Sequence, residues 1–240
     1  MNDNQRRRYL RNAEIDELCE GLIREYAGST YATQPVDIIG FATKYLKLRI
    51  LMANINEADM SKLGFLSDGK TPISISKNGI TVSHIFPVNT IVIDKVLCRE
   101  SEKSRRLFTI AHEVFHYLEA RLNGTETAAA FHSEFDREEN YTAKELAMKF
   151  AYNECQADRG AAALLMPKAL LENTLSQFNG NMPIAVYGRN LFTARDRATL
   201  CNVADYLGVS LTALVIRMEH LNLFEKHVFC EYVSDGLHLN

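Results

Sequence analysis

The spacing of apolar residues along the chain predicts a first part that mixes helices and strands. Over residues 13–27, apolar side chains recur every three or four positions, which is typical of an amphipathic helix, and Gly28 follows where such a helix would end. A second helix is expected to open at Pro35 and to continue to about Leu46. After it the hydrophobic period shortens, so residues 47–55 are predicted to form a strand.

Two further apolar runs flank the strongest turn signal in the sequence. Residues 72–76 and 80–86 enclose Asn78 and Gly79, a pair that is typical of a tight β-hairpin. Residues 90–94 add one more apolar strand. These segments predict a small, mostly antiparallel sheet in the first 95 residues.

Everything after this sheet is predicted to be helical. Apolar periodicity places helices over residues 101–121, 142–165 and 168–178, and two more within 196–224 that are separated at Gly208-Val209-Ser210. Thr142 and Glu145 have the spacing of a capping box at the start of the second of these helices. The expected fold class is α+β, with the sheet packed on the helix over 101–121 and a helical C-terminal half.

Charge and cysteine content exclude several classes of protein. The net charge of −3 gives no reason to expect non-specific binding to nucleic acid or to an anionic membrane. The five cysteines include no Cys-x-x-Cys pair, which argues against a disulfide framework or an all-thiolate zinc site. No apolar core follows the arginines at residues 6–8, and no run is long enough to span a membrane. We expect a cytoplasmic protein with reduced thiols.

The candidate chemistry lies in the helix over 101–121, where residues 112–116 read His-Glu-Val-Phe-His. Side chains four positions apart share one helix face, with β-carbons about 5–6 Å apart, so His112 and His116 can reach one zinc ion. Glu113 would stand beside that ion, where it can accept a proton from the attacking water. A helical wheel places both histidines opposite the apolar arc, so that one side of the helix packs into the core and the other lines a cleft.

A catalytic zinc ion needs a third protein ligand, and the helix over 142–165 offers Glu154. The wheel of this helix places Glu154 and Asp158 in its buried arc or at its edge, where an unpaired carboxylate is costly. Zinc would satisfy Glu154, and Asp158 could accept the free N–H of a ligating imidazole. A structural ion pair with an arginine is the alternative for both carboxylates; the candidates are Arg105, Arg106 and Arg159. The small residues at 160–163 would let this helix approach its neighbour closely.

Three segments together resemble the ImmA/IrrE family of metallopeptidases. They read Arg-Leu-Phe-Thr-Ile-Ala-His-Glu-Val-Phe-His (106–116), Glu-Cys-Gln-Ala-Asp (154–158) and Ala-Leu-Leu-Met-Pro (163–167), and the resemblance extends over roughly residues 60–224. Carried over position by position, it implies zinc ligands at His112, His116 and Glu154, with Glu113 catalytic.

The sequence departs from the family pattern at three positions. Phe115 stands where many members have glycine, Gln156 where many have glutamate, and Gly160 where an aromatic residue is common. None of these changes removes a ligand or the base. Phe115 is expected to narrow or reshape the cleft beside His116.

The resemblance also implies the biological role. Relatives cut a helix-turn-helix repressor and so switch on genes of a mobile element or a stress response, which implies a regulatory endopeptidase whose partner is a protein. We expect a metallopeptidase-like domain over 1–178 and a helical, helix-turn-helix-like segment over 179–240 that packs on the core or recognises substrate.

Two other functions stay open at this point. The helices within 196–224 have the spacing of a DNA-binding helix-turn-helix, although acidic residues balance the basic ones and disfavour a phosphate-tracking surface. A zinc-binding module without catalysis, which acts by associating with a repressor, would have the same ligands.

A donor to the developing oxyanion is not assigned; the unranked candidates are His132, Tyr141, Tyr187 and Arg189.

Overall fold

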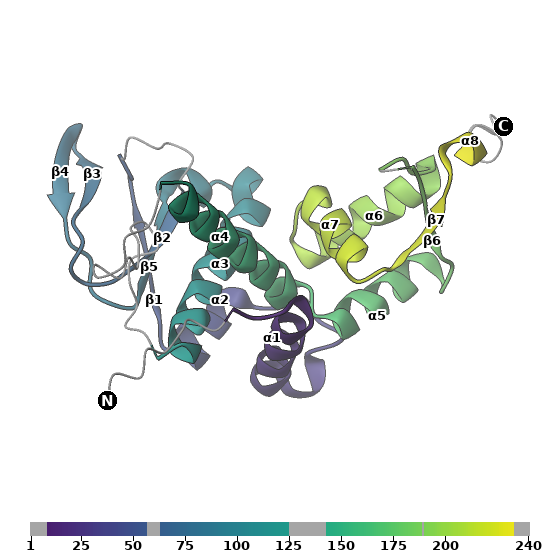
Figure 1. Cartoon of the computed structure of the whole chain (residues 1–240), viewed down its shortest axis with the longest axis horizontal. Coiled ribbons are helices and arrows are strands. Elements are labelled where there is room, and N and C mark those ends of the chain that lie inside the picture. Colours follow the sequence, from purple (N-terminus) through teal and green to yellow (C-terminus); the bar gives the residue numbers. More distant parts are fainter. Residues whose placement is uncertain (1–8, 57–62, 125–142, 189, 233–240) are drawn as a thin grey trace. The chain divides into compact units, whose positions relative to one another are not determined.

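The computed structural model describes residues 9–56, 63–124, 143–188 and 190–232, and the side chains of 143–151 lie outside this description. The chain divides into two compact units, which are described one at a time (Figure 1). Unit 1 comprises Met1–Cys19 and Asp37–Ala161, and unit 2 comprises Glu20–Val36 and Ala162–Asn240. The division that the sequence suggests after residue 178 stays a prediction.

The predicted first helix is confirmed as α1 (Asn12–Ala27), and the second begins later than predicted. The side chain of Asp37 accepts a hydrogen bond of 2.8 Å from the backbone N–H of Gly40, so Asp37, and not Pro35, caps the first turn. The helix α2 (Ile38–Gly40) then continues as a π-helical turn, η2 (Phe41–Tyr45).

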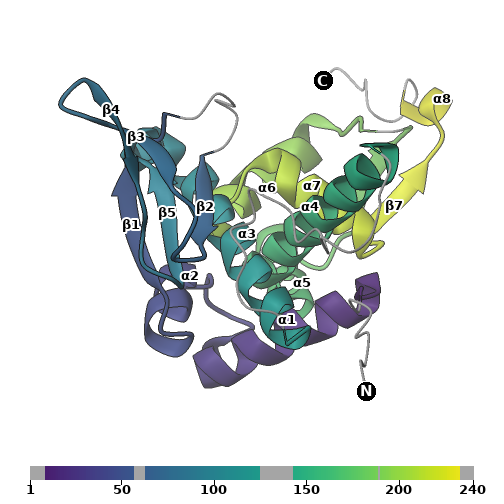
Figure 2. The same ribbon diagram turned by 60° about the vertical axis from the view of Figure 1, so that its left-hand side comes forward.

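A three-stranded sheet forms the centre of unit 1, in the order β1-β5-β2 (Figure 2). β5 (Thr90–Asp94) pairs in parallel with β1 (Arg49–Ala53) and antiparallel with β2 (Gly64–Ser67). The three central residues of β5, 91–93, are fully buried, which explains why this strand reads as a continuous apolar run. β2 was not predicted from the sequence; it has only four residues and begins with a glycine.

The predicted hairpin is confirmed and forms a second, two-stranded sheet, which an antiparallel bridge between Ile55 and Ile75 joins to the segment after β1. β3 (Ile73–Lys77) and β4 (Ile80–His84) pair antiparallel. Asn78 and Gly79 join them with φ angles of 54° and 79°, the left-handed backbone that a type I′ turn requires. Two of the three strand pairings in the described part of unit 1 are therefore antiparallel, and the α+β class is confirmed.

The long helix α3 (Lys103–Leu122) packs against the three-stranded sheet through β2 and β5 (Figure 2). Its buried apolar residues include Ile110, Ala111, Val114 and Leu118, four of the positions in the predicted apolar arc. Two short 3-10 helices, η3 (Lys95–Cys98) and η4 (Glu100–Glu102), lead from β5 into α3.

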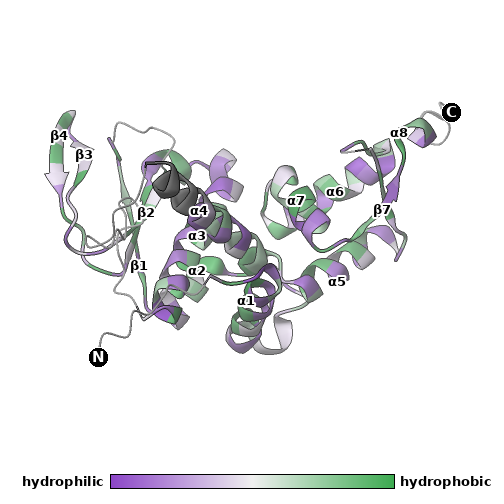
Figure 3. Cartoon of the chain, viewed as in Figure 1, coloured by the Kyte–Doolittle hydropathy of each residue, from purple (hydrophilic) through white to green (hydrophobic). Residues whose placement is uncertain are grey.

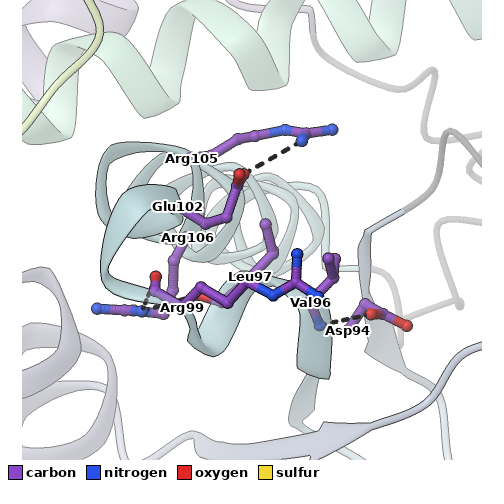
Figure 4. Close-up of polar contacts among 7 residues, drawn as sticks. All are labelled: Asp94, Val96, Leu97, Arg99, Glu102, Arg105 and Arg106. Atoms are coloured by element: carbon purple, nitrogen blue, oxygen red, sulfur yellow. Dashed lines mark hydrogen bonds and ion pairs between the residues drawn. The ribbon is translucent and has the colours of Figure 1, made fainter.

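Polar contacts fix this connection between β5 and α3 (Figure 4). The carboxylate of Asp94 accepts a 2.7 Å hydrogen bond from the backbone N–H of Val96. The guanidinium of Arg106 donates to the carbonyl oxygens of Leu97 at 2.7 Å and of Arg99 at 3.4 Å. Arg106 therefore ties the start of α3 to the segment before it.

The helix α4 (Ala143–Leu165) lies beside α1 in unit 1. Arg159 forms a 2.8 Å ion pair with Asp16, and the amide of Gln156 donates to the carbonyl oxygen of Leu10. The predicted capping residue Thr142, and the polar stretch before it, lie outside the described residues.

Unit 2 is mainly helical, and its helices carry both hydrophobic and hydrophilic residues (Figure 3). It contains η1 (Gly28–Thr30), α5 (Lys168–Asn179), α6 (Ala194–Leu207), α7 (Leu211–His220) and α8 (Phe229–Glu231). The expectation that everything after residue 95 is helical is wrong, because β6 (Ile184–Tyr187) and β7 (Phe224–His227) form a parallel pair. Each strand has four residues, too few for a clear alternation of apolar and polar positions.

No single helix among the described residues is long and apolar enough to cross a membrane. α6 and α7 reach the necessary length and apolar character only when taken together, and the chain bends by 101° between them. None of the five cysteines, all of which lie in the described part of the chain, forms a disulfide bond.

Candidate active site

The two histidines of α3 point their ring nitrogens at one place. Nε2 of His112 lies 3.0 Å from Nε2 of His116, and the ring planes meet at 75°. The side chains are 16% and 10% exposed, so both are largely covered yet reach solvent. The spacing of four residues has this effect because it puts both side chains on one helix face.

Glu154 reaches the same place from α4. Its Oε2 lies 3.2 Å from Nε2 of His112, and its Oε1 lies 3.6 Å from Nε2 of His116. Two helices that are far apart in sequence thus bring together the three side chains that the sequence analysis singled out as ligands.

The prediction that Glu154 and Asp158 lie in the buried arc of α4 or at its edge, away from solvent, is wrong. Their side chains are 49% and 62% exposed. A helical wheel superimposes all turns of a helix, whereas the burial of α4 changes along its axis. Residues 160–165 are buried. One or two turns earlier, the same side of the helix is exposed to solvent next to the histidines. The carboxylates are open to solvent on one side and face the histidines on the other.

The three side chains fit a divalent metal ion. A tetrahedral zinc ion with ligands at about 2.0–2.1 Å separates those ligands by about 3.3 Å from one another. The measured separations of 3.0, 3.2 and 3.6 Å bracket this value. His112, His116 and Glu154 form a group that could hold a metal ion, and two imidazoles with one carboxylate are a donor set that zinc accepts.

Asp158 supports one of these ligands. Its Oδ1 lies 3.0 Å from Nδ1 of His112, the ring nitrogen that faces away from Glu154. A carboxylate in this place accepts the Nδ1–H proton and leaves Nε2 free to bind a metal.

The arginines proposed as alternative partners of these carboxylates bond elsewhere. Arg159 pairs with Asp16, Arg105 pairs with Glu102 at 3.2 Å, and Arg106 donates to backbone carbonyls. The geometry therefore favours the histidines over a structural arginine pair.

Glu113 is buried beside the histidines. Its Oε2 has no hydrogen-bond partner among the described residues, and the backbone of Leu66 in β2 donates a hydrogen bond to its carboxyl group. Burial raises the pKa of Glu113, an effect that the charges of His112 and His116 partly oppose. A buried carboxyl group with a raised pKa and a free oxygen suits proton transfer near neutral pH.

The ligands influence one another electrostatically. Burial alone would lower the pKa of His112, but hydrogen bonds to Asp158 and Glu154 outweigh it and raise the pKa to about 10. Burial would raise the pKa of Glu154, but hydrogen bonds from His112 and His116 hold it below its usual range. The hydrogen bonds within this cluster therefore favour a positive charge on His112 and a negative charge on Glu154.

Two of the three departures from the family pattern are in contact with each other. Phe115 is fully buried and lies against Gly160, so its side chain does not line a cleft beside His116 and does not narrow one directly. The expectation that Phe115 reshapes the cleft stays a prediction. Gln156, the third departure, donates from its amide to the carbonyl oxygen of Leu10, in the segment before α1.

The contribution of β2 to the site was not predicted from the sequence. Leu66 binds Glu113 through its backbone, which leaves no signature in the residue type, and β2 itself was not predicted. Among the candidate oxyanion donors, Tyr187 stacks on His227 in unit 2, whereas His132, Tyr141 and Arg189 lie outside the described residues.

Comparison with known proteins supports the motif-based resemblance. The sequence model of the IrrE N-terminal-like domain, Peptidase_M78, matches residues 96–219, slightly more than half of the chain, and this range includes α3 and α4. A search of curated proteins found no match. The chain therefore belongs to the Peptidase_M78 family of IrrE N-terminal-like domains and is a metallopeptidase-like protein.

Proposed function

We propose that this protein is a zinc-dependent endopeptidase in which His112, His116 and Glu154 bind the metal and Glu113 is the general base. The observation that carries the proposal is the geometry of the three ligands, whose separations of 3.0–3.6 Å match the vertices of a tetrahedral zinc site. Three protein ligands leave a fourth position for water or substrate, as in catalytic zinc sites.

The residues have distinct roles in this proposal. A bound zinc ion would supply Lewis acidity, which polarises the scissile carbonyl and acidifies a water molecule. Glu113 accepts the proton from the attacking water on its free oxygen and then delivers it to the leaving amine. Asp158 fixes the tautomer and the ring orientation of His112 through the 3.0 Å contact.

The substrate that we propose is a helix-turn-helix repressor, whose cleavage in the cytoplasm would derepress genes of a mobile element or a stress response. The support is the membership of the family and the resemblance of the three motifs. Substrate recognition is the role that we propose for the helices of unit 2.

The contacts of two basic residues in unit 2 argue against their use in binding DNA. Arg217 is buried and donates from Nε to the carbonyl oxygen of Met166, so it is not available to phosphates. Lys226 forms a 2.6 Å ion pair with Glu219. A surface that tracks a phosphate backbone needs unpaired positive charge.

The test is to incubate the purified protein with the repressor encoded beside it, with and without a metal chelator. We expect fragments that disappear when the chelator is added and return with zinc. In Glu113→Gln we expect zinc to remain bound and cleavage to fall by a factor of about 10² or more, because the proton acceptor is lost while the ligands are kept.

Three outcomes would each overturn a part of this proposal. A stable complex without fragments would favour a zinc-binding regulator that does not cleave, and cleavage by Glu113→Gln at the parental rate would remove the role of Glu113. Binding to duplex DNA with a clear dependence on salt would assign the unit 2 helices to DNA instead.

A further inference from the structure

The helices that carry the proposed ligands meet at one tight contact, between Phe115 of α3 and Gly160 of α4. Both residues are buried, and the Phe115 side chain is completely so. Phe115 directly precedes His116, and Gly160 follows Asp158 by two residues and Glu154 by six. The contact therefore lies within about 9 Å along α4 of both acidic residues of the site.

Gly160 has no room for a side chain. A β-carbon at this position would lie 2.0 Å from Cδ2, 2.1 Å from Cγ and 2.4 Å from Cε2 of Phe115, whereas real β-carbons do not approach other atoms closer than 3.0 Å. The Phe115 side chain is completely buried, so a rotation about χ1 that moved the ring away from Gly160 would drive it into neighbouring atoms. The space beside Gly160 is filled by the ring of the other helix.

We propose that the Phe115–Gly160 contact sets the distance between α3 and α4 and thereby places Glu154 and Asp158 against the histidines. Phe115 and Gly160 are positioning residues: neither touches the metal, and both act through the spacing of the helices. This inference rests on the proposed metal site. It specifies the contact that keeps the histidines of α3 at the correct distance from the carboxylates of α4.

The distances show why the site is sensitive to this contact. A β-carbon at 2.0 Å from the ring must move by at least 1 Å to reach an allowed distance. Metal–ligand distances tolerate changes of only about 0.2 Å. A displacement of α4 that relieves the clash is therefore several times larger than the site can absorb.

α4 is also held from the side of α1, which limits how it can adjust. The thiol of Cys19 lies 3.8 Å from the carbonyl oxygen of Gly160, and Arg159 pairs with Asp16 at 2.8 Å. The turn of α4 at Gly160 thus contacts α1 as well as Phe115. We therefore expect a larger residue at position 160 to shift α4 relative to α3 rather than to be accommodated by a local change.

The experiment is a titration of the metal-stripped full-length protein with cobalt(II), whose visible absorption reports the affinity and the geometry of the site. In Gly160→Ala we expect cobalt to bind at least about 10-fold more weakly, the scale of change seen when groups that support metal ligands are altered. The matched control is Gly21→Ala in α1, where a β-carbon would meet nothing within 4 Å and we expect a change of less than about twofold.

A second variant tests the shared space directly and remains informative if Gly160→Ala does not fold. The double variant with Phe115→Ala and Gly160→Phe returns one ring to the same space from the other helix. We expect it to bind cobalt at least about 10-fold more tightly than Phe115→Ala alone, with a spectrum like that of the parent.

The outcomes separate this inference from the proposed function. If the parent protein binds no cobalt, the metal site itself is wrong. If the parent binds cobalt and Gly160→Ala binds it equally well with the same spectrum, or if the double variant binds no better than Phe115→Ala, the positioning role is wrong and the metal site stands.

Discussion

Asp158 acts on the proposed site through a single hydrogen bond, which joins its Oδ1 to Nδ1 of His112 over 3.0 Å. Asp158→Asn keeps the shape of the side chain but removes the charge that favours the Nδ1–H tautomer. We expect zinc affinity to fall by a factor of about 10–100. Competition with a chromophoric chelator measures this change; Asp205→Asn, at an exposed position of α6, is the control. Equal affinities for the two variants would contradict the role of Asp158.

His112 makes the stability of the metal-free protein depend on pH. Its pKa is 6.5 in the unfolded chain and about 10 in the fold, because the hydrogen bonds to Asp158 and Glu154 outweigh the effect of burial. A raised folded pKa contributes stability that is complete below pH 6.5 and is lost as the pH rises towards 10. We therefore expect the melting temperature of the chelator-treated protein to fall across this window.

The variant His112→Gln separates this contribution from that of other groups. Since glutamine does not titrate, the fall in melting temperature between pH 6.5 and 10 should be smaller than in the parent. An identical pH dependence in the two proteins would show that His112 does not hold the proton.

The proposed metal ligands could be predicted from the sequence, whereas the burial of their side chains could not. The pairing of His112 with His116 follows from helix geometry alone, which is local. The 49% exposure of Glu154 depends on which part of α4 is covered by other elements, and no pattern within α4 contains that information.

Among the elements, β2 approaches α3 more closely than any side chain at Gly64 would allow. A β-carbon there would lie 2.6 Å from Cγ2 of Thr109. In Gly64→Ala we expect a loss of about 1–3 kcal/mol in the free energy of unfolding, the range for overpacked sites. Denaturant unfolding measures it, and Thr109→Ala in the same chain should recover part of the loss because it removes Cγ2.

The same control glycine serves this prediction. Gly21→Ala has open space around the new methyl group and should leave the free energy of unfolding unchanged or slightly higher. If Gly64→Ala behaves like Gly21→Ala, the strand is not held at this distance from the helix.

Elements that depend on turn residues or on apolar periodicity within one segment were predicted. Short strands that depend on pairing with a distant strand were not. The hairpin of β3 and β4 follows from Asn78 and Gly79, and α3 follows from its apolar period. β2, β6 and β7 have four residues each and owe their structure to a neighbouring strand. The parallel pairing of β1 with β5 joins segments about 40 residues apart, which a pattern within either strand does not reveal.

At the scale of the whole molecule, all four residues of the proposed site and Glu113 lie in unit 1. Binding to the folded state stabilises it by about 4 kcal/mol when the free ligand exceeds its dissociation constant 1,000-fold. We expect zinc to slow amide hydrogen exchange in α3 and in residues 152–161 of α4, because opening of these segments breaks the site. Exchange in α6 and α7 should not change. Uniform protection of both units, or none, would contradict this prediction.

The central claim is that His112, His116 and Glu154 hold one zinc ion between two helices. Anomalous diffraction at the zinc edge from crystals of the zinc-loaded protein tests it most directly. The predicted result is one peak per chain, about 2.0–2.2 Å from Nε2 of both histidines and from a carboxylate oxygen of Glu154. The absence of a peak there, or a peak to which Glu154 is not bound, would contradict the claim.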